Sequence, residues 1–276
     1  AAVLALKAGL DMDLGGNAYG KNLQKALEEG AITMDDLNRA VANVLRLKFR
    51  MGLFENPYVS PEQAKQVVRS KAHKELAREV ASEGIVLLKN EGVLPLKKNI
   101  GSIAVIGPNA DMMYNQLGDY TAPQEREEIV TVLDGIRKAV SPSTKVNYVK
   151  GCAIRDITTS NITAAVEAAR AADAVVLVVG GSSARDFKTK YIGTGAADVS
   201  NDGNQLLSDM DCGEGYDRST LRLLGDQEKL LEAVAATGKP LVVIYIQGRT
   251  LNMNLASEKA QALLTAWYPG EQGGAA

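Results

Sequence analysis

The sequence predicts an α/β fold with an open, mostly parallel sheet sandwiched between helices. From about Ile103, short apolar segments alternate with helical patterns. The segment 174–179 is a continuous apolar run rich in β-branched residues, which is typical of a parallel strand covered on both faces. The right-handed connection rule then favours an open doubly wound sheet over other arrangements of these elements.

The composition excludes several classes of protein. Of the 276 residues, 46% are hydrophobic and 23% are charged, as in ordinary globular proteins, and the net charge is −2. This near-neutral balance lacks the excess of positive charge that is typical of nucleic-acid-binding proteins. No apolar run reaches the roughly 20 residues that a membrane helix needs. We therefore predict neither a nucleic-acid partner nor a membrane partner.

Few residues in the sequence are suited to disulfides or to metal binding. Cys152 and Cys212 are too few for a disulfide framework, and we expect two free or buried thiols. A zinc site needs several thiolate or imidazole ligands, and His73 is the one histidine. We predict no metal and no cofactor, and we interpret His73 as a residue on a helix face or a packed imidazole.

The first part of the chain, to about Tyr58, has the pattern of the end of a helical layer. Two short helices are expected at 2–9 and at 22–29. Thr33 followed by Asp36 is a capping box that opens a longer helix, whose apolar residues recur every three or four positions. Gly52 ends that helix. A turn follows at 56–58.

A second capping signal begins the next part. Ser60 stands at the N-cap position, with Pro61 at the first helical position. The helical pattern runs from about Pro61 to Glu83, with a possible break near Ser70. A strand-like run follows at 85–88. We expect this stretch to bridge two domains.

The alternating part supplies the elements of the predicted sheet. Strands are expected at 103–106, 146–149, 174–179, 241–246 and 262–266, and helices at 129–140, 163–172 and 226–237.

A long polar insertion between Ser182 and Arg218 interrupts this alternation. It contains five glycines and little periodicity. A loop this long inside a compact domain is usually functional or mobile. It also starts at the carboxyl end of a parallel strand, which is where open α/β sheets bind ligands. The insertion is therefore the first place to look for a site.

Several common active-site motifs are absent from the sequence. There is no phosphate-binding G-x-x-x-x-G-K-[ST] motif, no G-x-G-x-x-G spacing after the strand at 174–179 and no G-x-S-x-G elbow. A hydrolase triad would also need a second histidine. Asn161 opens a formal glycosylation sequon, but a helix N-cap role explains it better.

The most informative cluster is the segment 209–218, in which acidic residues alternate with glycines. Glu214 lies between two glycines, on backbone that can approach a ligand closely. The alternative is a solvated loop in which Arg218 pairs with its neighbour Asp217. One carboxylate does not make a glycosidase, because both standard mechanisms need two.

Eight segments, in order along nearly the whole chain, resemble the conserved pieces of glycoside hydrolase family 3. They are A-G-L-D-M-D at 8–13, L-R-L-K-F-R-M-G-L-F with N-P-Y at 45–58, L-A-R-E with V-L-L-K-N and L-P-L at 76–96, I-A-V-I-G-P-N at 103–109, G-D-Y at 118–120, G-E-G-Y-D-R at 213–218, G-K-P at 238–240 and A-W-Y-P-G at 266–270. Each is a weak match alone, but their shared order is specific.

The resemblance implies a domain plan. Residues 1–58 would be the last elements of a TIM-like (β/α) barrel domain, 59–84 an interdomain linker helix and 85–276 a C-terminal α/β sandwich domain that is truncated at its end. We therefore expect the chain to be part of a longer protein that includes the rest of the barrel. Asp11 and Asp13 would help to shape the mouth of that barrel.

The resemblance also implies a retaining exo-acting β-glycosidase, a β-glucosidase or a β-xylosidase, acting on oligosaccharides or aryl glycosides. Glu214 matches the family's acid/base, with Asp211 as second choice. Tyr216 either stacks on a sugar or packs within the loop. The nucleophile, an Asp in the barrel domain, would lie before residue 1, so we expect the isolated chain to be inactive.

Other interpretations remain open at this point. Without its nucleophile, the sandwich domain would be a catalytically incomplete carbohydrate-binding domain. A flavodoxin-like nucleotide-binding domain is a third possibility, although no phosphate cradle supports it. The resemblance fits a bacterial source and a periplasmic or secreted protein, with a cytoplasmic location as the alternative. It allows an oligomer.

Overall fold

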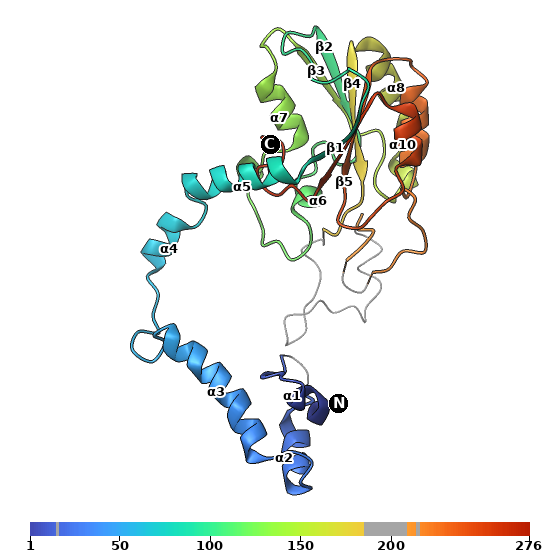
Figure 1. Ribbon diagram of the computed structural model, residues 1–276. Helices are drawn as coiled ribbons and strands as arrows, with labels where there is room; N and C mark the ends of the chain where they lie inside the picture. Colours follow the sequence, from blue (N-terminus) through green and yellow to red (C-terminus); the bar gives the residue numbers. More distant parts are fainter. Residues whose placement is uncertain (15–16, 185–208, 214–215) are drawn as a thin grey trace. The chain divides into compact units, whose positions relative to one another are not determined.

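A computed structural model describes residues 1–14, 17–184, 209–213 and 216–276 of the chain (Figure 1). The chain forms two compact units, Ala1–Val68 and the described residues from Arg69 to Ala276. The boundary between the units falls inside the predicted linker 59–84. The assignment of these parts to a barrel end, a linker and a sandwich domain stays a prediction.

The first unit is helical. Its helices are α1 (Ala2–Lys7), α2 (Gly20–Glu28), α3 (Met34–Arg50) and α4 (Pro61–Val67). A small core of Leu6, Ala26, Ile32 and Ala40 joins the first three. Among the described apolar side chains of this unit, only these four and Ala2 are buried, and large apolar residues of α3 such as Leu47 and Phe49 are exposed.

The predicted helix caps of this unit are confirmed. The Thr33 hydroxyl accepts a hydrogen bond from the Asp36 amide, and the Asp36 carboxylate accepts one from the Thr33 amide. Gly52, with a φ of 67°, follows the end of α3. Ser60 caps α4 by accepting from the Gln63 amide.

The second unit contains a six-stranded sheet. The strands are β1 (Val86–Asn90), β2 (Ser102–Ile106), β3 (Lys145–Val149), β4 (Ala174–Gly180), β5 (Leu241–Ile246) and β6 (Ala262–Trp267). Their order across the sheet is β1-β6-β5-β4-β2-β3. β1 runs antiparallel to β6, and all other neighbours are parallel. The predicted α/β fold with a mostly parallel sheet is confirmed.

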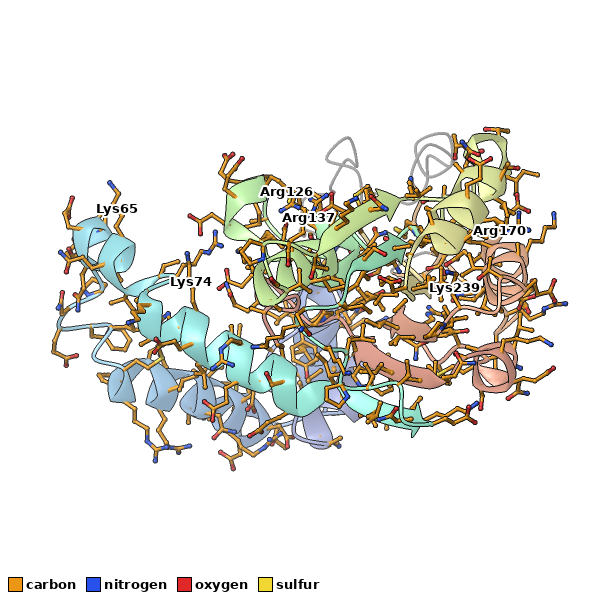
Figure 2. All side chains as sticks on the ribbon, turned by 90° about the horizontal axis from the view of Figure 1, so that it is seen from above. Lys65, Lys74, Arg126, Arg137, Arg170 and Lys239 are labelled. Atoms are coloured by element: carbon orange, nitrogen blue, oxygen red, sulfur yellow. The ribbon has the colours of Figure 1, made fainter. Side chains whose placement is uncertain are left out.

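Helices cover both faces of this sheet. They are α5 (Lys71–Gly84), α6 (Met113–Leu117), α7 (Val132–Ala139), α8 (Ile162–Ala171), α9 (Gln227–Ala235) and α10 (Asn254–Lys259), with 3-10 turns at Arg126–Glu128 and Ile157–Thr159. α8, α9 and α10 pack on one face and α7 packs on the other. Figure 2 shows this division, with Arg137 of α7 and Arg170 of α8 on opposite sides of the sheet. No helix in the described ranges is both long and apolar enough to cross a bilayer.

The central strand β4 explains the two-sided core. All seven of its residues are buried. Val175, Leu177 and Val179 face the α8–α9–α10 layer, whereas Val176 and Val178 face α7. Side chains alternate between the faces of a strand, so a strand with helices on both sides must be apolar throughout.

Three elements differ from the sequence prediction. The helix expected at 129–140 begins only at Val132, because Thr131 forms a capping box with Asp134. The short helices α6 and α10 were missed, since neither shows an apolar repeat. By contrast, the break expected near Ser70 in the helical pattern at 61–83 is confirmed: α4 and α5 are separate helices, and the break lies at Val68–Ser70, where Arg69 has a φ of 57° and Ser70 caps α5.

Candidate functional site at the carboxyl edge of the sheet

The carboxyl ends of the parallel strands carry a chain of buried polar side chains. The Ser182 hydroxyl, just after β4, donates to the Asn115 amide oxygen at 2.7 Å. Asn115 Nδ2 donates in turn to Asn109 Oδ1, also at 2.7 Å, and Asn109 follows β2. All three residues are buried. Buried amides and hydroxyls are stable only when they are hydrogen-bonded, so this network fixes the edge of the sheet.

Asp211 is bound at this edge through both carboxylate oxygens. Its Oδ1 accepts from the backbone amide of Ser182 at 2.7 Å, and its Oδ2 accepts from Arg218 Nη1 at 2.7 Å. The Asp211 amide also donates to the Ser182 carbonyl at 2.8 Å. The side chain of Asp211 is 0% exposed, so it is closed off from solvent.

Arg218 does not pair with its neighbour Asp217, which corrects the sequence prediction. The Arg218 side chain is 5% exposed and points inward to Asp211. The Asp217 side chain is 95% exposed and reaches Arg249 at 3.4 Å. The two neighbouring side chains thus point in opposite directions. The buried carboxylate of Asp211 requires a cation, and Arg218 supplies it.

Asp209 anchors the same segment to the loop after β3. Its two carboxylate oxygens accept from the amides of Ile154 and Arg155 at 2.7 and 2.8 Å. Arg155 Nη1 donates to the Met210 carbonyl at 2.9 Å. Asp209 belongs to the acidic cluster that the sequence predicts, whereas Arg155 was not predicted, because no motif marks it.

Tyr216 lies under a cation. The guanidinium of Arg155 is 4.9 Å from the centroid of the Tyr216 ring, within range of a cation–π interaction. The Tyr216 amide donates to the Gly213 carbonyl at 3.1 Å, and the two residues form an antiparallel bridge. The ring is therefore packed on one face. Its predicted contact with a sugar remains a prediction.

Glu214, the residue predicted as acid/base, lies outside the described residues, as do Gly215 and the insertion from 185 to 208. The nearest described residues on either side are Gly213 and Tyr216, and beyond them lie the buried partners Asp211 and Arg218. The structure therefore describes the base of the segment that carries Glu214.

Both cysteines are free and buried, as predicted. Burial raises the pKa of the Cys212 thiol to about 11 and that of Cys152 to about 12. Cys212 Sγ lies 3.6 Å from the Tyr268 hydroxyl. Within the part of the chain that the structure describes, no group of three or more His, Cys, Asp or Glu side chains is arranged to hold a metal ion.

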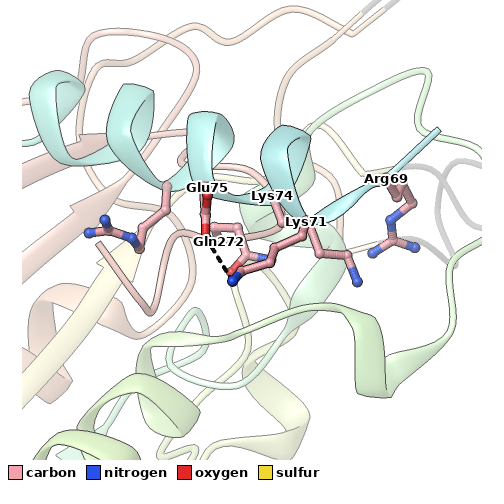
Figure 3. A pocket seen from close by; sticks show the side chains of 6 residues that line it. Arg69, Lys71, Lys74, Glu75 and Gln272 are labelled. Atoms are coloured by element: carbon pink, nitrogen blue, oxygen red, sulfur yellow. Dashed lines mark ion pairs between the residues drawn. The ribbon is translucent and has the colours of Figure 1, made fainter. Parts of the chain in front are cut away.

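A concavity of about 330 Å³ lies at the start of α5. Figure 3 shows its side chains, which are Arg69, Lys71, Lys74, Glu75, Arg78 and Gln272. Its cations are largely neutralised: Arg69 pairs with Glu271 at 2.7 Å and Lys74 with Glu128 at 2.6 Å. These contacts fix the start of α5, and they leave little positive charge for a ligand.

The nearby His73 is exposed on α5, as predicted for a helix-face residue. Its amide donates to the Ser70 hydroxyl that caps the helix.

Comparisons with known proteins identify the second unit. The family model described as "Glycosyl hydrolase family 3 C-terminal domain" matches residues 85–276. A β-xylosidase of Formosa agariphila is 36% identical, over 99% of this chain and 36% of its own length. A periplasmic β-glucosidase of Salmonella typhimurium is 35% identical, over 98% of this chain and 35% of its own length.

Solved structures agree with these matches. A β-glucosidase from Erythrobacter marinus has a TM-score of 0.77 and 32% identity, covering 99% of this chain and 37% of that one. A β-glucosidase from Listeria innocua in complex with glucose has a TM-score of 0.76 and 28% identity, covering 99% and 34%. This chain spans about a third of the length of these relatives. The chain belongs to glycoside hydrolase family 3, and its residues 85–276 are the C-terminal α/β domain of that family.

Proposed function

We propose that this chain is the acid/base-bearing part of a retaining exo-β-glycosidase that removes terminal β-linked glucose or xylose from oligosaccharides or aryl glycosides. The observation that carries the proposal is the position of the G-E-G-Y-D-R segment. Its last residue, Arg218, forms a buried ion pair with Asp211, two residues before the segment, at the carboxyl edge of the sheet. This is the edge at which α/β sheets bind ligands.

Glu214 has the chemistry that this reaction needs. In a retaining mechanism two carboxyl groups stand about 5 to 5.5 Å apart. One attacks the anomeric carbon, while the other protonates the leaving oxygen and then activates water. Partial burial and the charge of the nucleophile raise the pKa of such an acid toward neutrality. We assign Glu214 to the acid/base role and place the nucleophile in the barrel domain.

The burial of Asp211 favours Glu214 over Asp211 for this role. A general acid must reach the leaving oxygen of the substrate, directly or through one water. The Asp211 carboxylate is 0% exposed, and both of its oxygens are already bound by protein donors. We therefore assign Asp211 to holding the loop in place and not to proton transfer.

The first unit supports the presence of a barrel domain. Large apolar side chains on α3 and after it are more than half exposed: Leu47, Phe49, Met51, Phe54, Tyr58 and Val59. Exposed apolar surface of this extent marks an interaction site. We propose that residues 1–58 complete a barrel that also supplies the nucleophile. The isolated chain is then inactive.

Asp11 and Asp13 have local partners that suit a structural role at the barrel mouth. The Asp13 carboxylate accepts from the amides of Ala18 and Tyr19 at 2.7 and 3.0 Å. Asp11 accepts from Asn43 at 3.1 Å.

We also propose a periplasmic or secreted location. The support is the printed name of the Salmonella relative, a periplasmic β-glucosidase. Cell fractionation of the source organism tests it, and activity confined to the cytoplasmic fraction would contradict it.

The stereochemistry of the product tests the proposed reaction. The protein that carries this chain together with its barrel domain is given aryl β-glucoside and aryl β-xyloside, and the first sugar released is followed by proton NMR. We expect the β-anomer to form first and then to mutarotate, and the faster substrate identifies the preferred sugar. Initial release of the α-anomer would overturn the retaining mechanism. Failure to cleave either sugar would favour a carbohydrate-binding domain.

A further inference from the structure

We propose that a groove beside α5 binds β-linked oligosaccharides, with the indole of Trp267 as the platform on which one sugar ring stacks. The groove has a volume of about 510 Å³, and it is lined by α5 and by the chain at and after the end of β6. All of its lining residues belong to the second unit. The choice of sugar class rests on the proposed function, whereas the existence of the site does not.

The backbone at the end of β6 is irregular where it carries Trp267. The register between β5 and β6 shifts by one residue just before Trp267, which pairs with Ile246. Trp267 also has a φ of 54°, a region that bulky residues rarely adopt. Such irregularities redirect side chains and are frequent at ligand sites. The result is a Trp267 side chain that lines the groove and is 44% exposed.

Apolar side chains form much of the groove. Leu76 and Val80 of α5 line it and are more than half exposed. Tyr268 lines it as well, and its ring is packed against the backbone after β5, since a Cβ added at Gly248 would lie 2.2 Å from Tyr268 Cε2. A ring held in this way loses little conformational freedom when a ligand binds, which favours affinity.

Polar groups of two residues accompany this apolar lining. The Glu271 carboxylate is held by Arg69, whose Nε and Nη2 lie 2.9 and 2.7 Å from Glu271 Oε2. Neither contact uses Oε1, which can accept a hydrogen bond from a ligand hydroxyl. His73, exposed on α5, adds an imidazole to the lining. Apolar and aromatic walls with a few polar groups are typical of small-molecule sites.

This combination of groups fits a β-linked sugar better than a protein partner. The faces of a glucose or xylose ring carry C–H groups that can stack on the negative face of an indole, and its hydroxyls project from the rim of the ring. A protein surface would have to remove water from the Glu271 carboxylate, and charged residues are depleted in the centre of protein interfaces. Sugar hydroxyls would instead hydrogen-bond to that carboxylate.

The fluorescence of Trp267 tests the proposal, because it is the one tryptophan of the sequence. The chain is titrated with cellotetraose and xylotetraose, and with the α-linked maltotetraose as a control. We expect at least one β-linked sugar to give a saturable blue shift of the emission, with a Kd of about 1 mM or below, and maltotetraose to give none. No shift with either β-linked sugar, or an equal shift with maltotetraose, would overturn the proposal.

Three variants locate the binding site. Leu76→Glu places a charge on an exposed part of the apolar wall and keeps the fluorescent reporter, and Trp267→Leu removes the platform but keeps an apolar side chain. Calorimetry should show that each weakens binding at least about tenfold. Ile157→Ala, which alters an exposed apolar residue outside the groove, should bind like the unaltered chain. Unchanged affinity in Leu76→Glu or in Trp267→Leu would overturn the assignment of the groove.

The readout is binding and not cleavage, so a failure here is distinguishable from a failure of the proposed function, which product analysis tests. Sedimentation and emission measured over a range of protein concentrations test a second copy of the chain as the occupant. A blue shift that follows protein concentration and not sugar concentration would assign the groove to self-association and overturn the proposal.

Discussion

The Asp211 carboxylate lies 2.7 Å from Arg218 Nη1, and the two side chains are 0% and 5% exposed. An ion pair this deeply buried loses the solvation of both charges, and it is stable only because further hydrogen bonds complete it. Here the Ser182 amide binds the second oxygen of the carboxylate. Removing either partner therefore leaves a buried charge uncompensated and is expected to destabilise the fold.

Arg218→Met is expected to destabilise the second unit by about 3–5 kcal/mol, because it leaves the buried Asp211 charge unpaired. Urea denaturation measures this difference. The control is Lys259→Met, which removes an exposed pair with Glu258 and should cost less than about 1 kcal/mol. A loss below about 1 kcal/mol for Arg218→Met would show that the pair is not desolvated.

Gly180→Ala is expected to destabilise the sheet by at least about 2 kcal/mol. Gly180 ends β4 with a φ of 140°, and an added Cβ would lie 1.9 Å from the Ile246 carbonyl oxygen. Gly238 also has a positive φ, but nothing lies within 4 Å of its added Cβ. Gly238→Ala therefore measures the cost of the strained backbone alone. Equal losses of unfolding free energy for the two variants in urea denaturation would contradict a steric clash between position 180 and the Ile246 carbonyl.

Stability is expected to fall on acidification, in part through Glu128. A hydrogen bond from Lys74 lowers the pKa of this carboxyl below its ordinary value of 4.5. A lowered folded-state pKa means that the contribution is present above pH 4.5 and is lost as the pH falls through the folded-state value.

Lys74→Met removes this contribution and should flatten the acid limb of a stability profile between about pH 6 and about pH 3. Lys71→Met, in the same helix but with its side chain 91% exposed, is the control. An acid limb as steep in Lys74→Met as in the unaltered protein would show that the Glu128 contact adds no pH dependence.

Both thiols are expected to react slowly with iodoacetamide in the folded protein. The thiolate is the reactive form, and burial raises the pKa of Cys212 to about 11 and that of Cys152 to about 12. Mass spectrometry should find both unlabelled near neutral pH and both labelled in urea. Rapid labelling of Cys212 in the native protein would mean that the Asp211 segment opens readily.

The sequence was sufficient to predict the strands of the sheet, because each buried strand is a short, continuous apolar run. It did not predict the direction of β1. The apolar residues of β1 are compatible with a parallel or an antiparallel strand. Its antiparallel pairing with β6 depends on the position at which the chain leaves α5. The helix α10 was missed since its sequence, N-L-A-S-E-K, carries too few apolar positions to show a helical repeat.

The site was predicted only in part, for a similar reason. Glycines and acids close in sequence marked the segment 209–218, and the family resemblance marked Glu214 within it. The partner of Arg218 could not be inferred, because the choice between Asp217 and Asp211 depends on which carboxylate the fold buries. Arg155 is about sixty residues away in the sequence. It contacts Met210 and Tyr216 because the fold of the sheet places the loop after β3 beside the segment 209–218.

The most direct measurement of the central claim is the turnover of Glu214→Ala in the protein that carries the barrel domain. With an activated aryl β-glycoside and no azide, we expect a low kcat, because the glycosyl-enzyme forms but water is not activated. Azide should raise kcat and yield a β-glycosyl azide. Asp217→Ala, in the same segment but 95% exposed, should behave like the unaltered enzyme. Near-normal turnover of Glu214→Ala without azide would contradict the assignment and return attention to Asp211.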